Sequence, residues 1–449
     1  MYRVRSLFMA LLISIWFFSI AGCAETTASE AAAISAAKAD PSAYILSPDK
    51  AVKAEALYRI RALSKIGTPL VNILALFLIL QLRIAAGMRD VARKLSGNRW
   101  AQGFTFFFLF LLLITLVTLP LDVYLQHVRI GDGISIQSWA NWWGDQAKSF
   151  ALVYAFGGLG VMVLFFLIPK SPRKWWLWLW FPVATFGVLS VFVGPYLVDP
   201  LFNKFEPLSK SNPTLVAQLE LVVGRSNSIK IPPDRMFVMK ASDKVTSLNA
   251  YVTGFGDSKR IVVWDTMIAK ASPDQILPLF GHEMGHYVLG HIAENLAFSC
   301  VFIFVSFYVG FHLFGYLLDR FGGRWHVLSQ EDWAALAIFV MVITLISFMG
   351  DPIQNAFTRP QEHAADVYGE EIVHGIVSNP QASHQAALQL LGESNLATAN
   401  PSPFVEFWTD AAPPISFRTA FVKHYDPWTS DARPKYFSKD WGANLTPVP

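Results

Sequence analysis

At least six long apolar runs constrain the fold of this chain more than any other feature of its 449-residue sequence. A helix needs about 20 residues to cross a bilayer, and each run has that length or nearly so. Only 15% of the residues are charged, which is too few to cover a soluble domain of this size. We therefore predict a mainly α, polytopic membrane protein. The runs lie at 68–88, 103–125, 150–169, 175–198, 296–318 and 333–356.

The N-terminal segment 1–23 is basic at Arg3 and Arg5 and then apolar up to residue 22. This pattern is typical of a signal peptide and also of a first membrane helix. Residues 20–23 resemble a bacterial lipoprotein cleavage box with Cys23 as the lipidated residue, and both readings stay open. Residues 24–67 are Ala-rich and polar, and we expect a loop with some helix.

Basic residues concentrate in three loops that fall on one side of the membrane together with the basic N-terminus. The positive-inside rule then predicts that residues 199–294 and the tail lie outside the cytoplasm, which favours the inner membrane of a bacterium. The loop at 24–67 argues against this orientation, because it holds six basic residues on the outer side. The three basic loops contain Arg89, Arg93, Lys94 and Arg99, then Lys170, Arg173 and Lys174, then Arg320 and Arg324.

The polar stretch 199–294 separates the first four of these runs, within 68–198, from the last two, within 295–356. It contains three short segments with strand character, at 235–239, 249–254 and 260–264, and turn residues between the last two predict a hairpin. Ser272 is a candidate N-cap with Pro273 in the first turn of the helix that follows. We predict an inserted α+β domain.

The predicted helix carries His282, Glu283 and His286. Histidines four residues apart lie on one face of a helix, so both imidazoles can bind one Zn²⁺ ion. Zinc lowers the pKa of a bound water, and Glu283 is placed to take its proton and pass it to the leaving amine. The pattern predicts a catalytic metal site for hydrolysis.

A catalytic zinc needs a third protein ligand, and the tail 357–449 supplies the best candidate. Glu362 and Asp366 are four residues apart on a helix expected to begin near Pro360, although spacing alone also fits an ordinary exposed carboxylate at Glu362. Asp366 would orient a ligand histidine from the second shell. His363 is a weaker rival, since it points about 100° away from Glu362. His291 lies about 140° from His286 around a continuous helix and is expected in the second shell or in the chamber lining.

These motifs resemble those of the type I CAAX prenyl endopeptidases, a family of integral-membrane zinc metallopeptidases. The resemblance covers roughly residues 50–425. It rests on the zinc helix at 281–291, the strand pair within 248–266, the entry segment at 199–205 and the pattern Arg359-x-x-Glu362-x-x-Ala365-Asp366.

The resemblance implies a fold and a substrate mode. The fold would be a barrel of membrane helices around a wet chamber, capped by a zincin-like domain that binds one Zn²⁺ through His282, His286 and Glu362. Asn249, Ala250 and Tyr251 would lie on an edge strand that pairs with an extended peptide.

One position departs from the family. Ala412 stands where members usually have a histidine before Pro413 and Pro414, while Arg418 remains. If that histidine stabilises the oxyanion, this chain must use another donor, and Arg418 or His291 is the candidate. The lipoprotein-like box also suggests a bacterial protein, in which envelope or membrane proteins are the expected substrates.

Three functions compete at this point. A zinc endopeptidase acting on peptide or protein substrates in the bilayer leads. A non-catalytic zinc-containing chaperone or scaffold is supported only by Ala412, and a transporter or channel only by Asp351 at the end of a run. No dense stripe of Lys and Arg with interleaved aromatics exists, so nucleic acid is not expected as a partner.

Overall fold

A computed structural model describes residues 26–226, 229–254, 259–428 and 433–438 of the chain. The segment 1–23, for which a signal peptide, a membrane helix and lipidation at Cys23 were considered, lies outside the described residues.

Six helical segments of the described chain are long and apolar enough to cross a membrane, which confirms the predicted polytopic helical fold. The third is interrupted by a π-helical turn at Val153–Gly157. The segments are α3 (Pro48–Gln81), α5 (Arg99–Gly131), α6 with α7 (Trp139–Leu152 and Gly158–Lys170), α8 (Trp175–Leu197), α14 (His291–Trp325) and α15 (Ala335–Ile372).

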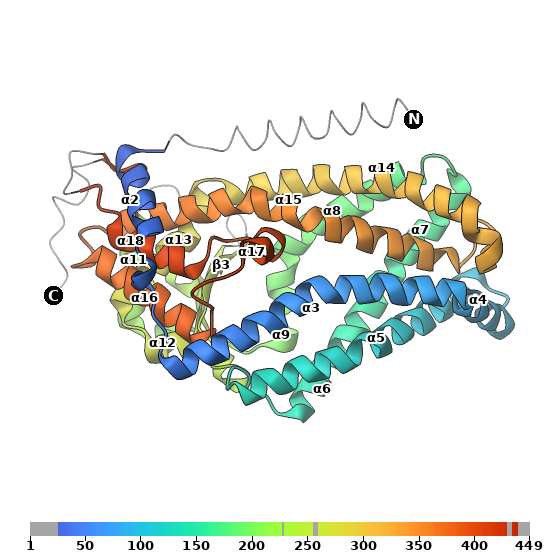
Figure 1. Ribbon diagram of the computed structural model, residues 1–449, viewed down its shortest axis with the longest axis horizontal. Coiled ribbons are helices and arrows are strands. Elements are labelled where there is room, and N and C mark those ends of the chain that lie inside the picture. Colours follow the sequence, from blue (N-terminus) through green and yellow to red (C-terminus); the bar gives the residue numbers. More distant parts are fainter. Residues whose placement is uncertain (1–25, 227–228, 255–258, 429–432, 439–449) are drawn as a thin grey trace.

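The long helices run roughly along the longest axis of the molecule, with α14 and α15 on one side and α3 and α5 on the other (Figure 1). A compact domain occupies one end, and the short helix α4 (Ile84–Leu95) lies at the other. Only 6% of the apolar window of α8 is buried, whereas 44% of that of α15 is buried. Helix α8 therefore presents its side chains to lipid, and α15 is the central helix.

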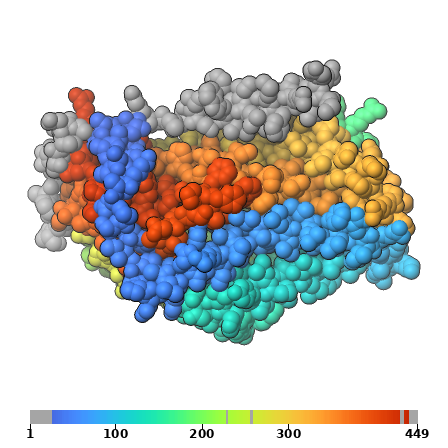
Figure 2. Space-filling model, viewed as in Figure 1, coloured from blue at the N-terminus to red at the C-terminus, as the bar shows by residue number. Residues whose placement is uncertain are grey.

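The segment 24–67 is more ordered than the predicted polar loop. It contains helix α2 (Ala28–Ala39) and the first part of α3. A capping box between Thr27 and Glu30 stabilises the start of α2. Ala33 and Ala37 of α2 are buried in a core shared with the C-terminal part of the chain. In the space-filling view the C-terminal segment is seated between α2, α3 and α15 (Figure 2). The sequence indicated some helix in this segment, but the packing partner of α2 is remote in sequence and could not be predicted from local composition.

The compact domain is built on a four-stranded sheet in the order β1-β2-β4-β3. Strands β2 and β4 are parallel, and the other two pairs are antiparallel. Three strands confirm the predicted segments, while β1 is too short to leave a pattern. The strands are β1 (Phe205–Pro207), β2 (Met236–Met239), β3 (Ala250–Thr253) and β4 (Arg260–Trp264), and part of the turn before β4 lies outside the described residues.

Helices cover this sheet and enclose its core, in which Leu219, Val263, Leu277 and Phe421 are almost fully buried. Three helices lie in the tail 357–449, where the sequence predicted only a helix near Pro360. The helices that contribute to this core are α10 (Leu208–Ser211), α11 (Pro213–Arg225), α12 (Asp265–Lys270), α13 (Pro273–Val288), α16 (Pro380–Ser394) and α18 (Ile415–His424). Two other short helices pack against the membrane helices: α9 (Asp199–Phe202) on α8, and α17 (Pro403–Thr409) on α15 and α3.

Helix α15 corrects a second expectation. The predicted membrane run ended at residue 356, with a new helix near Pro360, but α15 continues unbroken through both Pro352 and Pro360. Prolines persist inside membrane helices where neighbouring groups satisfy the carbonyl that each leaves free. At 38 residues α15 is about 57 Å long, far more than the bilayer core of about 30 Å. The excess carries Glu362 into the compact domain.

Candidate metal centre

Helix α13 presents the histidine motif on a buried face. Ser272 caps the helix, and its backbone N–H donates to the side-chain oxygen of Gln275 at 2.8 Å, as the capping-box pattern predicts. Pro273 occupies the first turn, where its missing N–H has no consequence. These contacts confirm the predicted start of the helix and fix the register that brings His282 inside.

Glycines allow α13 and α15 to cross almost backbone to backbone. A Cβ atom on Gly369 would lie 2.7 Å from both the backbone nitrogen of His282 and the carbonyl oxygen of Pro278. A Cβ on Gly281 would meet the Cα of Gly369 at 3.0 Å. No side chain larger than hydrogen fits at this crossing. The close approach brings Glu362, two turns earlier on α15, within reach of both histidines.

Three side chains converge on one point. The Nε2 atoms of His282 and His286 lie 3.2 Å apart. Glu362 places Oε2 at 3.5 Å from His282 Nε2 and Oε1 at 3.5 Å from His286 Nε2. Donors bound at about 2.0–2.1 Å to a tetrahedral ion are themselves about 3.3 Å apart, so the triangle has the dimensions of a metal site. Two imidazoles and one carboxylate also form a donor set found in hydrolytic metal sites.

Asp366 and Arg418 hold the first histidine in place. The Asp366 carboxylate, only 1% exposed, accepts a hydrogen bond from His282 Nδ1 at 2.8 Å, which leaves Nε2 free to bind a metal. Arg418 donates to both oxygens of Asp366, at 2.8 and 2.7 Å. Asp366 thus lies where an orienting residue is expected. Arg418 directs two donors at this carboxylate, and its role as an oxyanion donor stays a prediction.

His291 reaches the site by a route that the sequence did not reveal. The expected 140° offset assumed one continuous helix, but α13 ends at Val288 and Gly290 adopts a left-handed conformation with φ of 81°. The chain therefore turns, and His291 opens α14. Its Nδ1 lies 3.1 Å from Nδ1 of His286, so it contacts this candidate ligand on the ring nitrogen that faces away from the other two.

The three ionisable side chains of the histidine motif on α13 have shifted pKa values. Burial lowers the pKa of His282, but hydrogen bonds to Asp366 and Glu362 outweigh burial and raise it to about 9. Burial, together with the charge of His282, lowers the pKa of His286 to about 4. Burial raises the pKa of the Glu283 carboxyl, and the nearby Glu362 raises it further. The carboxylates of Asp366 and Glu362 thus place negative charge beside the imidazole of His282, as a cation site requires.

His363, the weaker candidate ligand, points away from the triangle. Its Nε2 lies 3.0 Å from Oε1 of Glu30 on α2, and its ring packs edge-on against Phe421 of α18. Lys435 donates to the same Glu30 carboxylate at 2.8 Å. Glu362 therefore belongs to the candidate metal site, whereas the next residue, His363, belongs to the contact between α15 and α2.

The edge strand β3 lies directly beside the proposed base. The backbone N–H of Trp264 donates to the carbonyl of Asn249 at 3.1 Å. In an antiparallel pair, every second residue turns its backbone groups toward the partner strand and the residues between turn theirs away. The backbone groups of Ala250 and Val252 therefore point away from β4, along the free edge. A hydrogen bond from the Val252 backbone reaches Glu283. We had named Asn249, Ala250 and Tyr251 for substrate, and we missed Val252, which strand alternation could have indicated.

The tail passes close to the metal triangle at the position of Ala412. Thr358, one turn before Glu362, donates its hydroxyl to the carbonyl of Ala411 at 3.1 Å. Arg359 donates to the carbonyl of Asp410 at 3.0 Å and to two carbonyls at the end of α17. Residue 412 therefore adjoins the part of α15 that carries the third candidate ligand.

Comparison with known proteins supports this geometry. Residues 209–426 match the model of peptidase family M48, and residues 35–204 match that of the CAAX prenyl protease N-terminal region with five membrane helices. A metalloprotease of Bacillus subtilis, named YhfN and described as uncharacterized, is 32% identical over 404 residues, which cover 90% of this chain and 91% of the relative. The chain belongs to peptidase family M48.

Other M48 relatives are more distant. CAAX prenyl protease 1 of Saccharomyces cerevisiae is 27% identical, with 71% of each chain covered. The human CAAX prenyl protease 1 homolog is 24% identical, with 72% of this chain and 74% of the relative covered. The crystal structure of S. mikatae Ste24p superposes with a TM-score of 0.73 at 22% identity, covering 91% of this chain and 98% of that one, which shows a shared fold.

The family identity confirms three predictions. The resemblance to CAAX prenyl endopeptidases is confirmed, and so is the helical membrane chamber with its small sheet. The protein is an integral-membrane metalloprotease, hence a hydrolase, and its family implies a metal at the triangle described above.

Proposed function

We propose that this protein is a zinc-dependent endopeptidase that cleaves extended segments of peptide or protein substrates. One observation carries the proposal. The triangle of His282, His286 and Glu362 adjoins Glu283, and Glu283 in turn is hydrogen-bonded to the free edge of β3. A metal site, a base and a peptide-binding edge thus meet at one place.

The donor set suits zinc. Two neutral imidazoles and one carboxylate at tetrahedral spacing leave one position open, as in catalytic zinc sites. When bound, the ion supplies Lewis acidity and makes water acidic enough to act as a nucleophile near neutral pH. Asp366 fixes His282 with its proton on Nδ1, so that Nε2 faces the other two donors.

Glu283 is placed to move the proton. Its carboxylate, when ionised, accepts a proton from the attacking water and delivers it to the amine of the broken peptide bond. Burial raises the pKa of Glu283, which makes it a stronger base than an exposed glutamate. The hydrogen bond from the Val252 backbone holds the carboxylate beside the edge strand.

The strand edge would orient the substrate. An extended peptide that pairs with the free backbone groups of Ala250 and with the carbonyl of Val252 adds a strand to the sheet beyond β3. Main-chain pairing tolerates many side chains, so it favours unfolded or flexible segments over one exact sequence. Asn249 and Tyr251 flank these groups and complete the proposed substrate contact.

The site is proposed to lie outside the cytoplasm of a bacterium, where envelope and membrane proteins are the available substrates. The basic loops gather at the end of the molecule that holds α4, opposite the metal site (Figure 1). The basic residues of 24–67 argue for the opposite orientation. That argument is weakened because several of them contact other groups of the protein. Lys50 pairs with Glu393, Arg59 with Glu55 and Lys65 with Asp410, and Arg61 donates to the carbonyl of Asn395.

A non-catalytic zinc scaffold is the second candidate, and Ala412 is the observation that favours it. The residue adjoins the metal-bearing part of α15 but offers no donor for an oxyanion. In that case the metal would serve stability alone.

The variant Glu283→Gln separates the two candidates. The proposal predicts that it keeps one zinc per chain, measured by elemental analysis, while cleavage of an unstructured fluorogenic peptide falls by at least about 100-fold. Asp274→Asn, on the first turn of the same helix, is the matched control and should retain activity. Unchanged cleavage by Glu283→Gln would refute the mechanism. If the zinc-loaded wild type does not cleave the peptide, with or without a chelator, the scaffold is favoured.

A further inference from the structure

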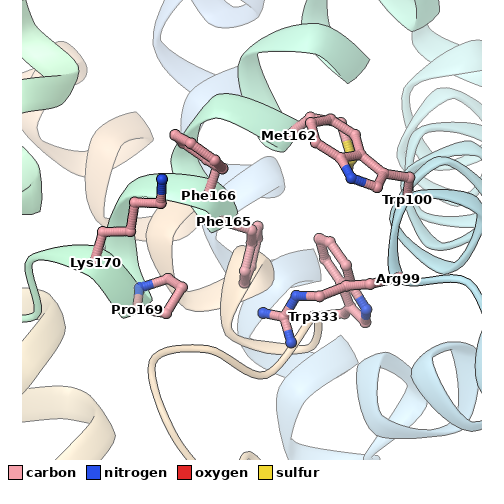
Figure 3. A pocket seen from close by; sticks show the side chains of 8 residues that line it. All are labelled: Arg99, Trp100, Met162, Phe165, Phe166, Pro169, Lys170 and Trp333. Carbon is pink, nitrogen blue, oxygen red and sulfur yellow. The ribbon is translucent and has the colours of Figure 1, made fainter.

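A cavity lies at the opposite end of the membrane helices from the metal site. It has a volume of about 360 Å³, within the usual range of about 300–1,000 Å³ for small-molecule sites. The first turn of α5, the last turns of α7 and the loop before α15 enclose it (Figure 3). All three are ends of membrane-crossing elements, so the cavity lies at the depth of the lipid headgroups.

The inner wall of this cavity is apolar and tightly packed. The rings of Phe165 and Trp333 lie with their centroids 4.5 Å apart, and Met162 packs beside them. All three side chains are at least 96% buried. Toward the outside, Trp100 is 55% exposed and Phe166 is 47% exposed. The cavity therefore continues into an aromatic surface that faces the membrane interface, where tryptophan is favoured.

Two cations stand over these aromatic rings. Arg99 lies 5.3 Å from the centroid of the Trp333 ring and donates to the carbonyl of Glu331 at 3.3 Å. The ammonium of Lys170 lies 3.9 Å from the centroid of the Phe166 ring. Within the part of the chain that the structure describes, neither cation forms an ion pair with a carboxylate. Figure 3 shows both beside the same cavity.

We propose that this cavity binds one anionic phospholipid. The phosphate of the headgroup would be held between Arg99 and Lys170, and one acyl chain would lie along Trp100 and Phe166. The combination supports a lipid over a soluble anion, because a free phosphate has no use for the aromatic wall. It supports an anionic lipid over a zwitterionic one, because no carboxylate among the described residues forms an ion pair with either cation.

Binding of defined lipids to the purified full-length protein tests this proposal. Native mass spectrometry in detergent would compare phosphatidylglycerol with phosphatidylcholine. We expect the wild type to prefer phosphatidylglycerol, and Arg99→Gln with Lys170→Gln to bind it about 30-fold more weakly, since each cation near the surface contributes about a factor of 5. Lys170→Gln alone should give about a fivefold loss, and it leaves the Arg99 contacts intact should the double variant fold poorly.

Arg93→Gln with Lys174→Gln is the matched control, because it removes the same charge from the same end outside the cavity. An equal loss in this control would overturn the proposal in favour of general surface charge. Displacement of the lipid by millimolar inorganic phosphate would overturn it in favour of a free-anion site. Trp100→Ala should weaken phosphatidylglycerol binding without changing the headgroup preference, and an altered preference would contradict the division of roles.

Discussion

The metal centre and the basic cavity lie at opposite ends of the same membrane helices and handle charge in opposite ways. At the metal centre, Asp366 is bonded to both His282 and Arg418 inside the protein. At the cavity, Arg99 and Lys170 rest on aromatic rings with no carboxylate partner among the described residues. A site that must hold side chains in one geometry pairs its charges internally, whereas a site that receives a charged ligand leaves them open.

Packing differs along the same helices. The crossing of α13 and α15 is closed by glycines with no room for a methyl group, as Gly369 shows. On the lipid-facing helix α8, Gly187 has no other atom within 4 Å of where its Cβ would lie. At the crossing that holds the chemistry, helix backbones therefore meet directly, whereas the outer helix is free to vary on its lipid face.

Among residues outside the metal triangle itself, the largest effect is expected from breaking the charge network around His282. Asp366→Asn should weaken zinc affinity by roughly 10–100-fold, because the amide no longer fixes the proton of His282 on Nδ1 or balances the charge of Arg418. Competition with a fluorescent chelator measures the change. Asp332→Asn is the control, since this carboxylate pairs with Arg89 at 2.6 Å at the other end of the molecule. Equal zinc loss in both variants would mean that the network does not act on the metal.

The contrast in packing predicts an intermediate effect. Gly369→Ala should destabilise the protein by about 1–3 kcal/mol, because the new methyl group must push α13 and α15 apart. Gly187→Ala should stabilise it slightly, by about 0.5–1 kcal/mol, through helix propensity. Thermal unfolding in detergent would compare them. A neutral Gly369→Ala would show that the crossing is looser than described.

The smallest effect concerns the contact between α2 and α15. Burial raises the pKa of Glu30, but hydrogen bonds from His363 and Lys435 outweigh it, so the pKa lies below its ordinary value of 4.5. Glu30→Gln should therefore cost about 1 kcal/mol at pH 7. The advantage of the wild type is fully present above pH 4.5 and is lost as the pH falls through the lowered pKa. A difference in unfolding temperature that does not shrink as the pH is lowered progressively below 4.5 would contradict the ion pairing.

Patterns of short range were predicted well from the sequence. The apolar runs, the strands at 236–239 and 260–264, and the helix that begins after Ser272 all depend on neighbouring residues. The spacing of His282 and His286 is likewise a local property of one helix. Such features need no knowledge of what packs against them.

Features that depend on remote contacts could not be predicted in the same way. Helix α2 is stabilised by the tail, and α15 continues through Pro360 because its surroundings tolerate the proline. The approach of His291 to His286 requires the left-handed turn at Gly290, for which a glycine is permissive but not diagnostic. Glu362 was a weak candidate by spacing and became a strong one only through resemblance to a family.

The central claim is that one metal site is closed by Glu362, which lies two membrane helices away in sequence from His282 and His286. Zinc per chain, measured by elemental analysis of purified Glu362→Gln and His363→Gln, tests it most directly. The account predicts that Glu362→Gln loses zinc, with affinity reduced more than about 100-fold, while His363→Gln keeps one zinc per chain. Full zinc occupancy in Glu362→Gln, or loss of zinc in His363→Gln alone, would contradict it.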